Sequence, residues 1–143
     1  MSEKTLKVVV NIDGGSRGNP GPAAAGVVVT DAATGAVLQE AGIYLGTATN
    51  NVAEYRGLLE GLRLAAALRA REVEIVSDSQ LLVFQMTGRY RVKHPGLAPL
   101  HLEAKGLAAQ FAQCSFRHVM REDNHHADRL VNQALNQKRD VRP

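Results

Sequence analysis

Residues 6–13 read LKVVVNID and are followed directly by two glycines. The run is short and rich in β-branched side chains, and it stops at a turn signal, which together are typical of a buried β-strand. It therefore predicts a strand whose last residue carries the Asp13 carboxylate. The glycine- and proline-rich segment 16–22 comes next and predicts a loop.

Beyond this run, the sequence shows strand patterns first and then alternating helix and strand patterns. Two more β-type runs, 25–31 and 36–45, are split by the turn signal Ala-Thr-Gly and predict an antiparallel hairpin. From Asn51 the apolar residues recur at i, i+3, i+4 and i+7, which predicts a long amphipathic helix to about Leu68. Further strands are expected at 73–77 and 115–120, and helices at 79–87, 97–113 and 124–138. This order implies the α/β class, with a mixed sheet flanked by helices.

Length and composition are those of an ordinary globular protein. The chain has 143 residues, 45% of them hydrophobic and 22% charged, which predicts one domain over 1–143 and excludes disordered, collagen-like and coiled-coil chains. Its apolar runs are too short to span a bilayer. The first residues contain no apolar leader and Cys114 is the only cysteine, so we expect a cytoplasmic protein without disulfides.

The basic residues are distributed unevenly along the chain. The formal net charge is +3, and no acidic residue lies between Asp78 and Glu103, where Arg89, Arg91 and Lys93 gather. A solvated basic loop and a surface for nucleic acid both fit this pattern. The charge pattern alone does not decide between them.

Four carboxylates stand where a sheet of this kind could use them for chemistry. Asp13 ends the first strand and Asp78 follows the fourth, while Glu54 and Asp128 lie near the starts of two helices. In open α/β sheets, ligands bind at the carboxyl ends of the strands. The four side chains could therefore meet at one edge of the sheet.

Each of these acids also has a purely structural interpretation. Asp13 could be a turn residue, and Asp78 could cap the helix that follows it. Glu54 stands at capping-box spacing from Asn51, and Asp128 suits the positive end of a helix. Their convergence favours chemistry, because clustered carboxylates repel unless a cation neutralises them. Oxygen ligands suit Mg²⁺ or Mn²⁺, and two such ions form the metal clamp of nucleases.

Two other types of site are not expected. The loop 14–21 matches neither G-x-G-x-x-G nor a Walker motif, and it leads into a strand, which argues against dinucleotide and P-loop binding. His125 and His126 are adjacent in a predicted helix and point about 100° apart. Cys114 lies outside any zinc-type spacing, so a zinc site is not expected either.

Four motifs, in chain order, resemble those of type 1 ribonuclease H. They read DGGSRGNPGP at 13–22, TNNVAEY at 49–55, SDSQ at 77–80 and NHHADRL at 124–130. The resemblance covers nearly the whole chain and implies a ribonuclease H-like fold, with a mixed five-stranded sheet in the order 3-2-1-4-5. It also implies an endonuclease that cuts the RNA strand of an RNA·DNA hybrid, giving 5′-phosphate and 3′-hydroxyl ends.

By the same resemblance, Asp13, Glu54, Asp78 and Asp128 would hold two Mg²⁺ ions, for which Mn²⁺ could substitute. One ion would activate water, and the other would stabilise the departing 3′-oxygen. The partner would be an RNA·DNA hybrid, with no membrane involved and a monomer expected. The alternatives left open are a module that binds a hybrid or duplex RNA without cutting it, and a related nuclease of broader substrate range.

The residues that line the hybrid's minor groove in the family also have counterparts here. They correspond to Gly15, Ser16, Asn19, Asn50, Asn51 and Gln80. Thr49 corresponds to a contact with a DNA phosphate. Amides and N–H groups suit this task, because only RNA offers them a 2′-hydroxyl. Helix capping is the structural alternative for Asn50 and Asn51.

The chain departs from the family pattern in the segment 88–99. This segment is too short for the basic helix and loop that several members carry between their second and later helices. Arg89, Arg91 and Lys93 would be a remnant of that nucleic-acid-binding surface. The departure predicts a weaker affinity for the hybrid or a steeper dependence on conditions.

A second departure lies in the loop before Asp128, which lacks the histidine that assists product release in the family. Arg121 is the candidate substitute, as a contact to the phosphate or the leaving group. His118, His125 and His126 are the alternative candidates. A plain surface ion pair with a neighbouring acid of the same loop, Glu122 or Asp123, is the structural interpretation of Arg121.

Overall fold

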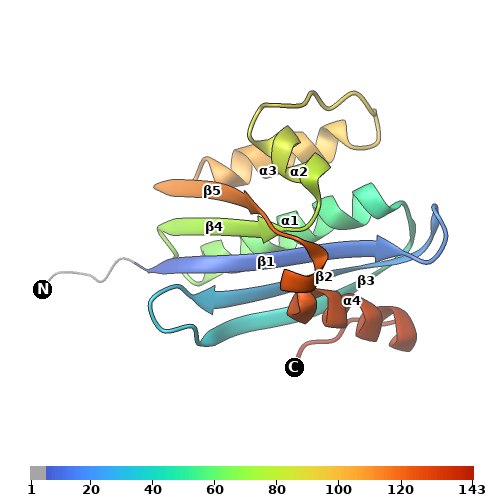
Figure 1. The fold of residues 1–143 in the computed structure, drawn as a ribbon, viewed down its shortest axis with the longest axis horizontal. Coiled ribbons are helices and arrows are strands. Elements are labelled where there is room, and N and C mark those ends of the chain that lie inside the picture. Colours follow the sequence, from blue (N-terminus) through green and yellow to red (C-terminus); the bar gives the residue numbers. More distant parts are fainter. Residues whose placement is uncertain (1–5) are drawn as a thin grey trace, which may run out of the picture.

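The computed structural model describes residues 6–143, and it opens with three antiparallel strands (Figure 1). These strands are β1 (Lys7–Ser16), β2 (Gly21–Asp31) and β3 (Val37–Ala48). The elements that follow are α1 (Asn50–Ala67), β4 (Glu72–Ser77), α2 (Gln80–Met86), α3 (Ala98–Ala108), β5 (Gln113–His118), the 3-10 turn η1 (Arg121–Asp123) and α4 (His125–Gln137).

The strands form one sheet in the order β3-β2-β1-β4-β5. β1 pairs antiparallel with β2, and β2 antiparallel with β3. β4 pairs parallel with β1 on one side and with β5 on the other. The parallel neighbours are joined through helices, as parallel strands require. The predicted class, mixed sheet and strand order are therefore confirmed.

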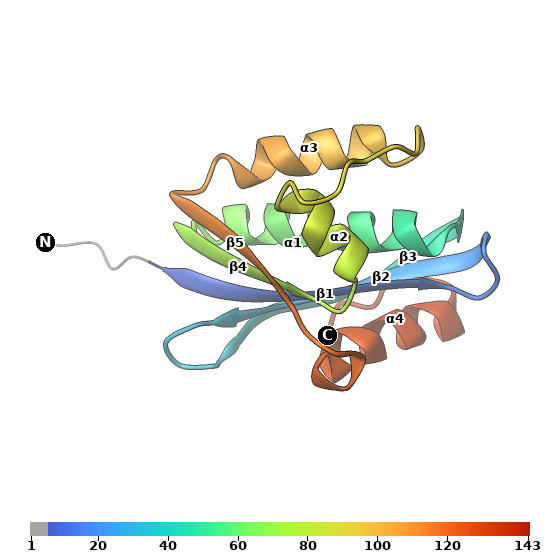
Figure 2. The ribbon, with the colours of Figure 1, turned by 45° about the horizontal axis from the view of Figure 1, so that its top comes forward.

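Helices cover both faces of this sheet. Figure 2 shows α1, α2 and α3 on one face and α4 alone on the other. The main core lies under α1, where Leu58 and Leu62 are fully buried beside Val10 and Ile12 of β1. Burying each of these leucines stabilises the fold by about 1.5–3 kcal/mol. The sheet and α1 thus form a rigid support for whatever the strand ends carry.

Several predicted boundaries are wrong. β2 begins at Gly21 rather than at 25, and β3 ends at Ala48 rather than at 45. β1 does not end at Asp13 but continues to Ser16, because Gly14 and Gly15 pair with β2, and only residues 17–20 form the turn. α3 ends at Ala108 rather than at 113, where β5 already begins. The turn that separates α3 from β5 is closed by backbone bonds from Gln110 and Phe111 to the last carbonyls of the helix.

The helices of the described residues bear on the expectation that no segment spans a bilayer. Within 6–143, no helix combines the length and apolarity that a transmembrane segment needs. The expectation that the chain lacks a leader rests partly on residues 1–5, which lie outside the described part.

Candidate active site

Parallel pairing of β1 with β4 sets two of the four carboxylates side by side. The register pairs Ile12 with Ser77, the last paired residues of this ladder. Asp13 and Asp78 are the next residues on each strand, so both follow the same edge of the parallel pair. Asp13 is 9% exposed and Asp78 is half-buried.

Two glycines beside Asp13 allow helices to approach the sheet closely. A Cβ on Gly14 would overlap the backbone of Ala53 and Glu54, at the start of α1. Gly26, the cross-strand partner of Asp13, lies equally close to the Ala127 carbonyl at the start of α4. Because neither glycine has a side chain, the starts of α1 and α4 approach the sheet beside Asp13 from opposite faces, and these starts carry Glu54 and Asp128.

The structural interpretations of three acids are wrong. Asp13 is not a turn residue, because it lies inside β1 opposite Gly26. Thr49 caps α1 by accepting a hydrogen bond from the Val52 N–H (3.2 Å), so the Asn51 capping box with Glu54 does not form. Ser79, not Asp78, caps α2. The fourth acid, in the first turn of α4, does suit the helix dipole.

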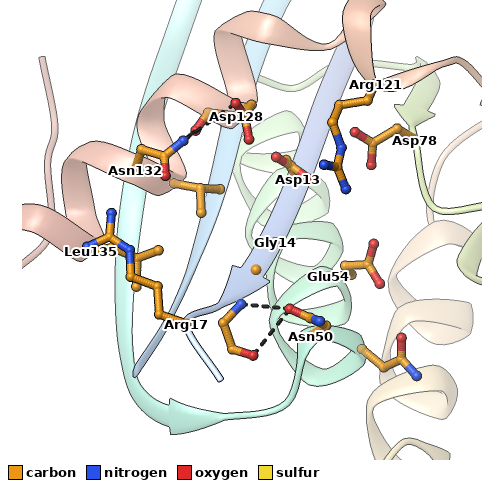
Figure 3. A pocket seen from close by; sticks show the side chains of 14 residues that line it. Asp13, Gly14, Arg17, Asn50, Glu54, Asp78, Arg121, Asp128, Asn132 and Leu135 are labelled. Atoms are coloured by element: carbon orange, nitrogen blue, oxygen red, sulfur yellow. Dashed lines mark hydrogen bonds between the residues drawn. The ribbon is translucent and has the colours of Figure 1, made fainter. Parts of the chain in front are cut away.

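These four acids line one open pocket of about 520 Å³ (Figure 3). The figure shows the Asp13 and Asp78 side chains beside β1 before its arrowhead, with Asp128 on the α4 side and Glu54 on the α1 side. The remaining lining residues are Gly14, Gly15, Ser16, Arg17, Asn50, Asn51, Arg121, Val131, Asn132 and Leu135. Strand ends, two helix starts and the β1–β2 turn therefore meet in a single concave site.

Burial and mutual repulsion raise the pKa of three of the acids. Burial is the largest cause at Asp13, whose pKa rises to about 8, with the charges of Asp78 and Asp128 adding to it. The pKa of Glu54 rises to about 7, again mainly through burial. The pKa of Asp78 is also raised by burial, although Arg121 opposes the shift. A cluster of acids whose pKa values are raised in this way is typical of a functional site.

A buried asparagine fixes the geometry between the sheet and α4. Asn124 is 2% exposed; its Nδ2 donates to the Ile12 carbonyl (2.9 Å) and its Oδ1 accepts from Asn11 Nδ2 (3.0 Å). The same side chain hydrogen-bonds Asp78 and thereby counters the rise in the pKa of that carboxyl. Its backbone carbonyl accepts the Asp128 N–H (3.2 Å). Asn124 thus links two of the acids to β1.

Arg121 lies in the pocket, as a functional role would require. Figure 3 shows its guanidinium beside Asp13 and Asp78, and its charge lowers the pKa of both Asp78 and Glu54. Within residues 6–143 it forms no ion pair with Glu122 or Asp123, which removes the surface interpretation. None of the three candidate histidines lines the pocket.

Two of these histidines lie near the site without entering it. His118 ends β5, and its charge lowers the pKa of Asp78. His126 turns toward β3, where its Nε2 lies 3.0 Å from Glu40 Oε2. Of the four basic candidates, Arg121 is therefore the one placed to contact a phosphate or leaving group at the acids.

The acids meet the chemical requirements of a divalent metal site. All four offer hard oxygen donors. The raised pKa values of Asp13, Glu54 and Asp78 indicate that burial leaves the negative charges of these three carboxylates poorly compensated. As the side chains stand, no three potential ligands in the described residues close around one point. Like charges repel, so a cation would have to draw the carboxylates together.

The predicted hybrid-binding residues of the loop and of α1 form one connected rim. Gly15, Ser16, Asn50 and Asn51 line the pocket. The Asn50 Oδ1 accepts the Ser16 N–H (2.7 Å), and the Asn50 N–H donates to Asn19 Oδ1 (3.1 Å). These bonds hold the β1–β2 turn against the start of α1.

The other predicted nucleic-acid contacts lie outside the pocket. Thr49 serves as the cap of α1, and Gln80 is the exposed first residue of α2. Arg89, Arg91 and Lys93 are exposed in the segment between α2 and α3, which contains no further helix. The Arg89 guanidinium stacks 5.0 Å from the Phe84 ring centre. The structure brings these residues to the surface but not to the acids.

Sequence reasoning missed one wall of the pocket. Val131, Asn132 and Leu135 follow Asp128 by three, four and seven residues, so helical periodicity alone could have placed them on its face. The Asn132 Nδ2 donates to the Asp128 carbonyl (3.2 Å). Arg17 lies in the turn, where no periodic signal exists, and nothing local marks it.

Comparisons with known proteins agree with this architecture. A family model described as Reverse transcriptase-like matches residues 11–134. A bifunctional protein of Mycobacterium tuberculosis is 52% identical over 130 residues, which cover 91% of this chain and 36% of that protein. The chain therefore spans little more than a third of the length of the curated relatives it matches first.

Three solved structures share the fold closely. The N-terminal RNase H domain of that mycobacterial protein, fused to maltose-binding protein, is 50% identical with a TM-score of 0.90, covering 93% of this chain and 96% of the other. RNase H1 of the archaeon Halobacterium salinarum is 40% identical with a TM-score of 0.88, covering 92% and 98%. A compost-derived RNase H1 in complex with an RNA/DNA hybrid is 39% identical with a TM-score of 0.86, covering 92% and 98%. By sequence, strand order and these matches, the chain belongs to the type 1 ribonuclease H family.

Proposed function

We propose that this chain is a metal-dependent endonuclease that hydrolyses the RNA strand of RNA·DNA hybrids, leaving 5′-phosphate and 3′-hydroxyl ends. One observation carries the proposal: Asp13, Glu54, Asp78 and Asp128 converge in a pocket whose rim holds asparagine amides. The RNase H1 that was crystallised with a hybrid shares 39% of its sequence with this chain. That likeness supports a hybrid as the substrate.

The four carboxylates would hold two Mg²⁺ ions, for which Mn²⁺ could substitute. Bound there, such ions supply Lewis-acid activation of water and neutralise charge on the leaving oxygen of an in-line displacement. Asp13 and Asp78 extend from the rigid sheet, whereas Glu54 and Asp128 extend from helix starts. The sheet thus fixes one pair of ligands, and the glycine contacts fix the helices that carry the other pair.

Arg121 would act on the phosphate that is cleaved. Its guanidinium lies among the acids and offers five N–H donors, which match the geometry of phosphate oxygens. A fixed positive charge near the reacting phosphorus stabilises the negative charge that develops in the transition state. Its exposure at the pocket edge leaves it free to reach the substrate.

The asparagines at the rim would select RNA in the minor groove. The Asn50 Oδ1 is already occupied by the Ser16 N–H, so its Nδ2 remains to donate to the substrate. Asn51 lines the same pocket and is exposed. An amide donor can bond a 2′-hydroxyl, which DNA lacks, and this contact reads the sugar without choosing bases.

The test is a cleavage assay on one end-labelled RNA, offered single-stranded, paired to DNA and paired to RNA. Each substrate is incubated with Mg²⁺, Mn²⁺ or EDTA, and the ends of the products are identified. We expect cleavage only of the hybrid, only with a metal, and with 5′-phosphate ends. Cleavage of RNA·RNA as well would show a nuclease of broader range. Binding of the hybrid without cleavage would reduce the chain to a binding module.

The protein is expected to act as a monomer, which light scattering tests.

A further inference from the structure

The acidic pocket has a second arginine on its rim, across from Arg121 in the view of Figure 3. Arg17 is the first residue of the turn between β1 and β2 and is exposed. Its backbone N–H donates to the Pro22 carbonyl (2.8 Å), which closes the turn. Ser16, the residue before it, is bonded to Asn50 of α1. The segment that carries Arg17 is therefore anchored at both ends.

The Arg17 side chain is oriented without being neutralised. Its Nη2 donates to the Asn136 Oδ1 of α4 (2.7 Å), a neutral amide. Within residues 6–143, no carboxylate lies at ion-pair distance from it. A guanidinium has five N–H donors, so several remain for an anion while the amide holds the group in place.

The position of Asn136 along α4 indicates which phosphate Arg17 could contact. Asp128 and Asn136 are eight residues apart on this helix, about 12 Å at 1.5 Å per residue. Asn132 and Leu135, which also line the pocket, lie between them. One strand of a duplex advances by only about 3.4 Å per nucleotide. A strand whose reacting phosphate lies at the acids would therefore bring a different phosphate to Arg17.

From this geometry we infer that Arg17, held by Asn136, binds a backbone phosphate of the cleaved RNA strand, away from the phosphate that reacts. The inference rests on the proposed function for the nature of the substrate. An unpaired guanidinium would also offset the repulsion between four carboxylates and a polyanion. Arg17 would contribute to binding and to register, whereas Arg121 would contribute to the chemical step.

The inference is tested by measuring the affinity for an RNA·DNA hybrid in EDTA over a series of salt concentrations. For Arg17→Ala we expect the slope of log K against log salt to fall in magnitude by about 0.7–0.9, as for one lost phosphate contact. The Kd should rise roughly 3–10-fold near 0.1 M salt. Arg17→Lys should keep the slope but recover only part of the affinity, because an ammonium lacks the planar fork.

The matched control is Arg139→Ala, since Arg139 is exposed and donates to an amide, Gln137 Oε1 (3.1 Å), outside the pocket. We expect it to change neither slope nor Kd. Asn136→Ala should keep the slope, with a smaller loss of affinity. With Mg²⁺, Arg17→Ala should raise KM and leave kcat within about twofold.

An unchanged slope and Kd in Arg17→Ala would overturn the inference. A lower Tm with an unchanged slope would also overturn it, because Arg17 would then only stabilise the packing of the turn against α4. If the wild-type chain binds the hybrid but does not cut it, the proposed function fails while the salt slope still decides the role of Arg17. If the wild-type chain binds no hybrid, both fail.

Discussion

At the scale of single residues, the carboxylates of the site repel one another, and bound cations would relieve this repulsion. Asp13 is buried and Glu54 is half-buried, and the pKa values of their carboxyls rise to about 8 and about 7. Sequence motifs identified both residues, but not this property, because burial comes from two helices that converge on β1. Arg121 shows the same limit: the sequence made it the candidate but left three histidines as alternatives, and only the fold separates them, because Arg121 lines the pocket and the histidines do not.

The first prediction concerns the stability of the metal-free protein. The pKa of Asp13 is 3.8 in the unfolded chain and about 8 when folded, so the native state binds more protons between these values. Stability must then fall as pH rises from about 4 to about 8. Asp13→Asn cannot ionise, and in EDTA at pH 8.5 we expect it to exceed the wild type by about 1–3 kcal/mol.

Urea unfolding at pH 4.5 and pH 8.5 measures this difference, with the exposed Asp123→Asn as the control. The gain from Asp13→Asn should be much smaller at pH 4.5, where the carboxyl is protonated in the folded protein and only the unfolded chain ionises. An equal gain at both pH values would mean that the strain does not come from ionisation of Asp13.

The second prediction concerns Arg121. If its guanidinium acts in the transition state, Arg121→Ala should lower kcat roughly 10–100-fold while changing hybrid affinity less than about threefold. Steady-state cleavage and binding in EDTA separate the two effects. Arg129→Ala removes an exposed arginine of α4 that does not line the pocket and should be silent. A normal kcat in Arg121→Ala would show that this residue takes no part in the reaction.

At the scale of elements, local patterns predicted which segments are strands and helices but not where each one ends. Gly14 and Gly15 are a turn signal in the sequence, yet they continue β1, because β2 supplies hydrogen-bond partners that no local pattern contains. The hydrogen bond between the Asn11 and Asn124 side chains joins residues 113 positions apart. Such contacts decide how α4 meets the sheet, and they arise only when the chain folds.

The third prediction concerns the close approach of α4 to β2. Gly26→Ala would push a methyl group into the Ala127 carbonyl, and we expect a loss of about 1–3 kcal/mol of stability, as for other overpacked sites. Because α4 carries Asp128, activity should fall at temperatures where the variant is still folded. Thermal denaturation and cleavage rates provide the measurement.

Gly106→Ala in α3 is the natural control for this substitution. A Cβ at Gly106 meets nothing within 4 Å, and alanine favours a helix over glycine by about 1 kcal/mol. This variant should therefore gain stability and keep its activity. If Gly26→Ala were as stable and as active as the wild type, the close approach would not matter for the site.

At the scale of the whole molecule, charge is divided between two regions. The pocket is acidic, whereas Arg89, Arg91 and Lys93 are exposed between α2 and α3. A duplex is longer than the pocket, so a substrate held at the acids would extend across other parts of the surface. The sequence suggested this basic segment from composition alone, but whether a duplex reaches it depends on the arrangement of the helices.

The fourth prediction tests this basic segment. Replacing Arg89, Arg91 and Lys93 together with alanine should raise KM and reduce the magnitude of the salt slope by up to about 2–2.7, as for three lost phosphate contacts. The value of kcat should change little, because none of the three lines the pocket. Arg139→Ala combined with Arg142→Ala serves as a control on another exposed region. A salt slope equal to that of the wild type would mean that the segment does not contact the duplex.

If the four carboxylates form the catalytic centre, the loss of one negative charge from them should stop the reaction, and Asp78→Asn measures this. The substitution keeps the size and shape of a half-buried side chain just after β4 but removes the negative charge that the proposed metal site needs. We predict that cleavage of the hybrid in Mg²⁺ falls at least about 1000-fold, while hybrid affinity in EDTA and the Tm are no lower than those of the wild type. Turnover near the wild-type rate, in a variant that folds and binds normally, would contradict the account.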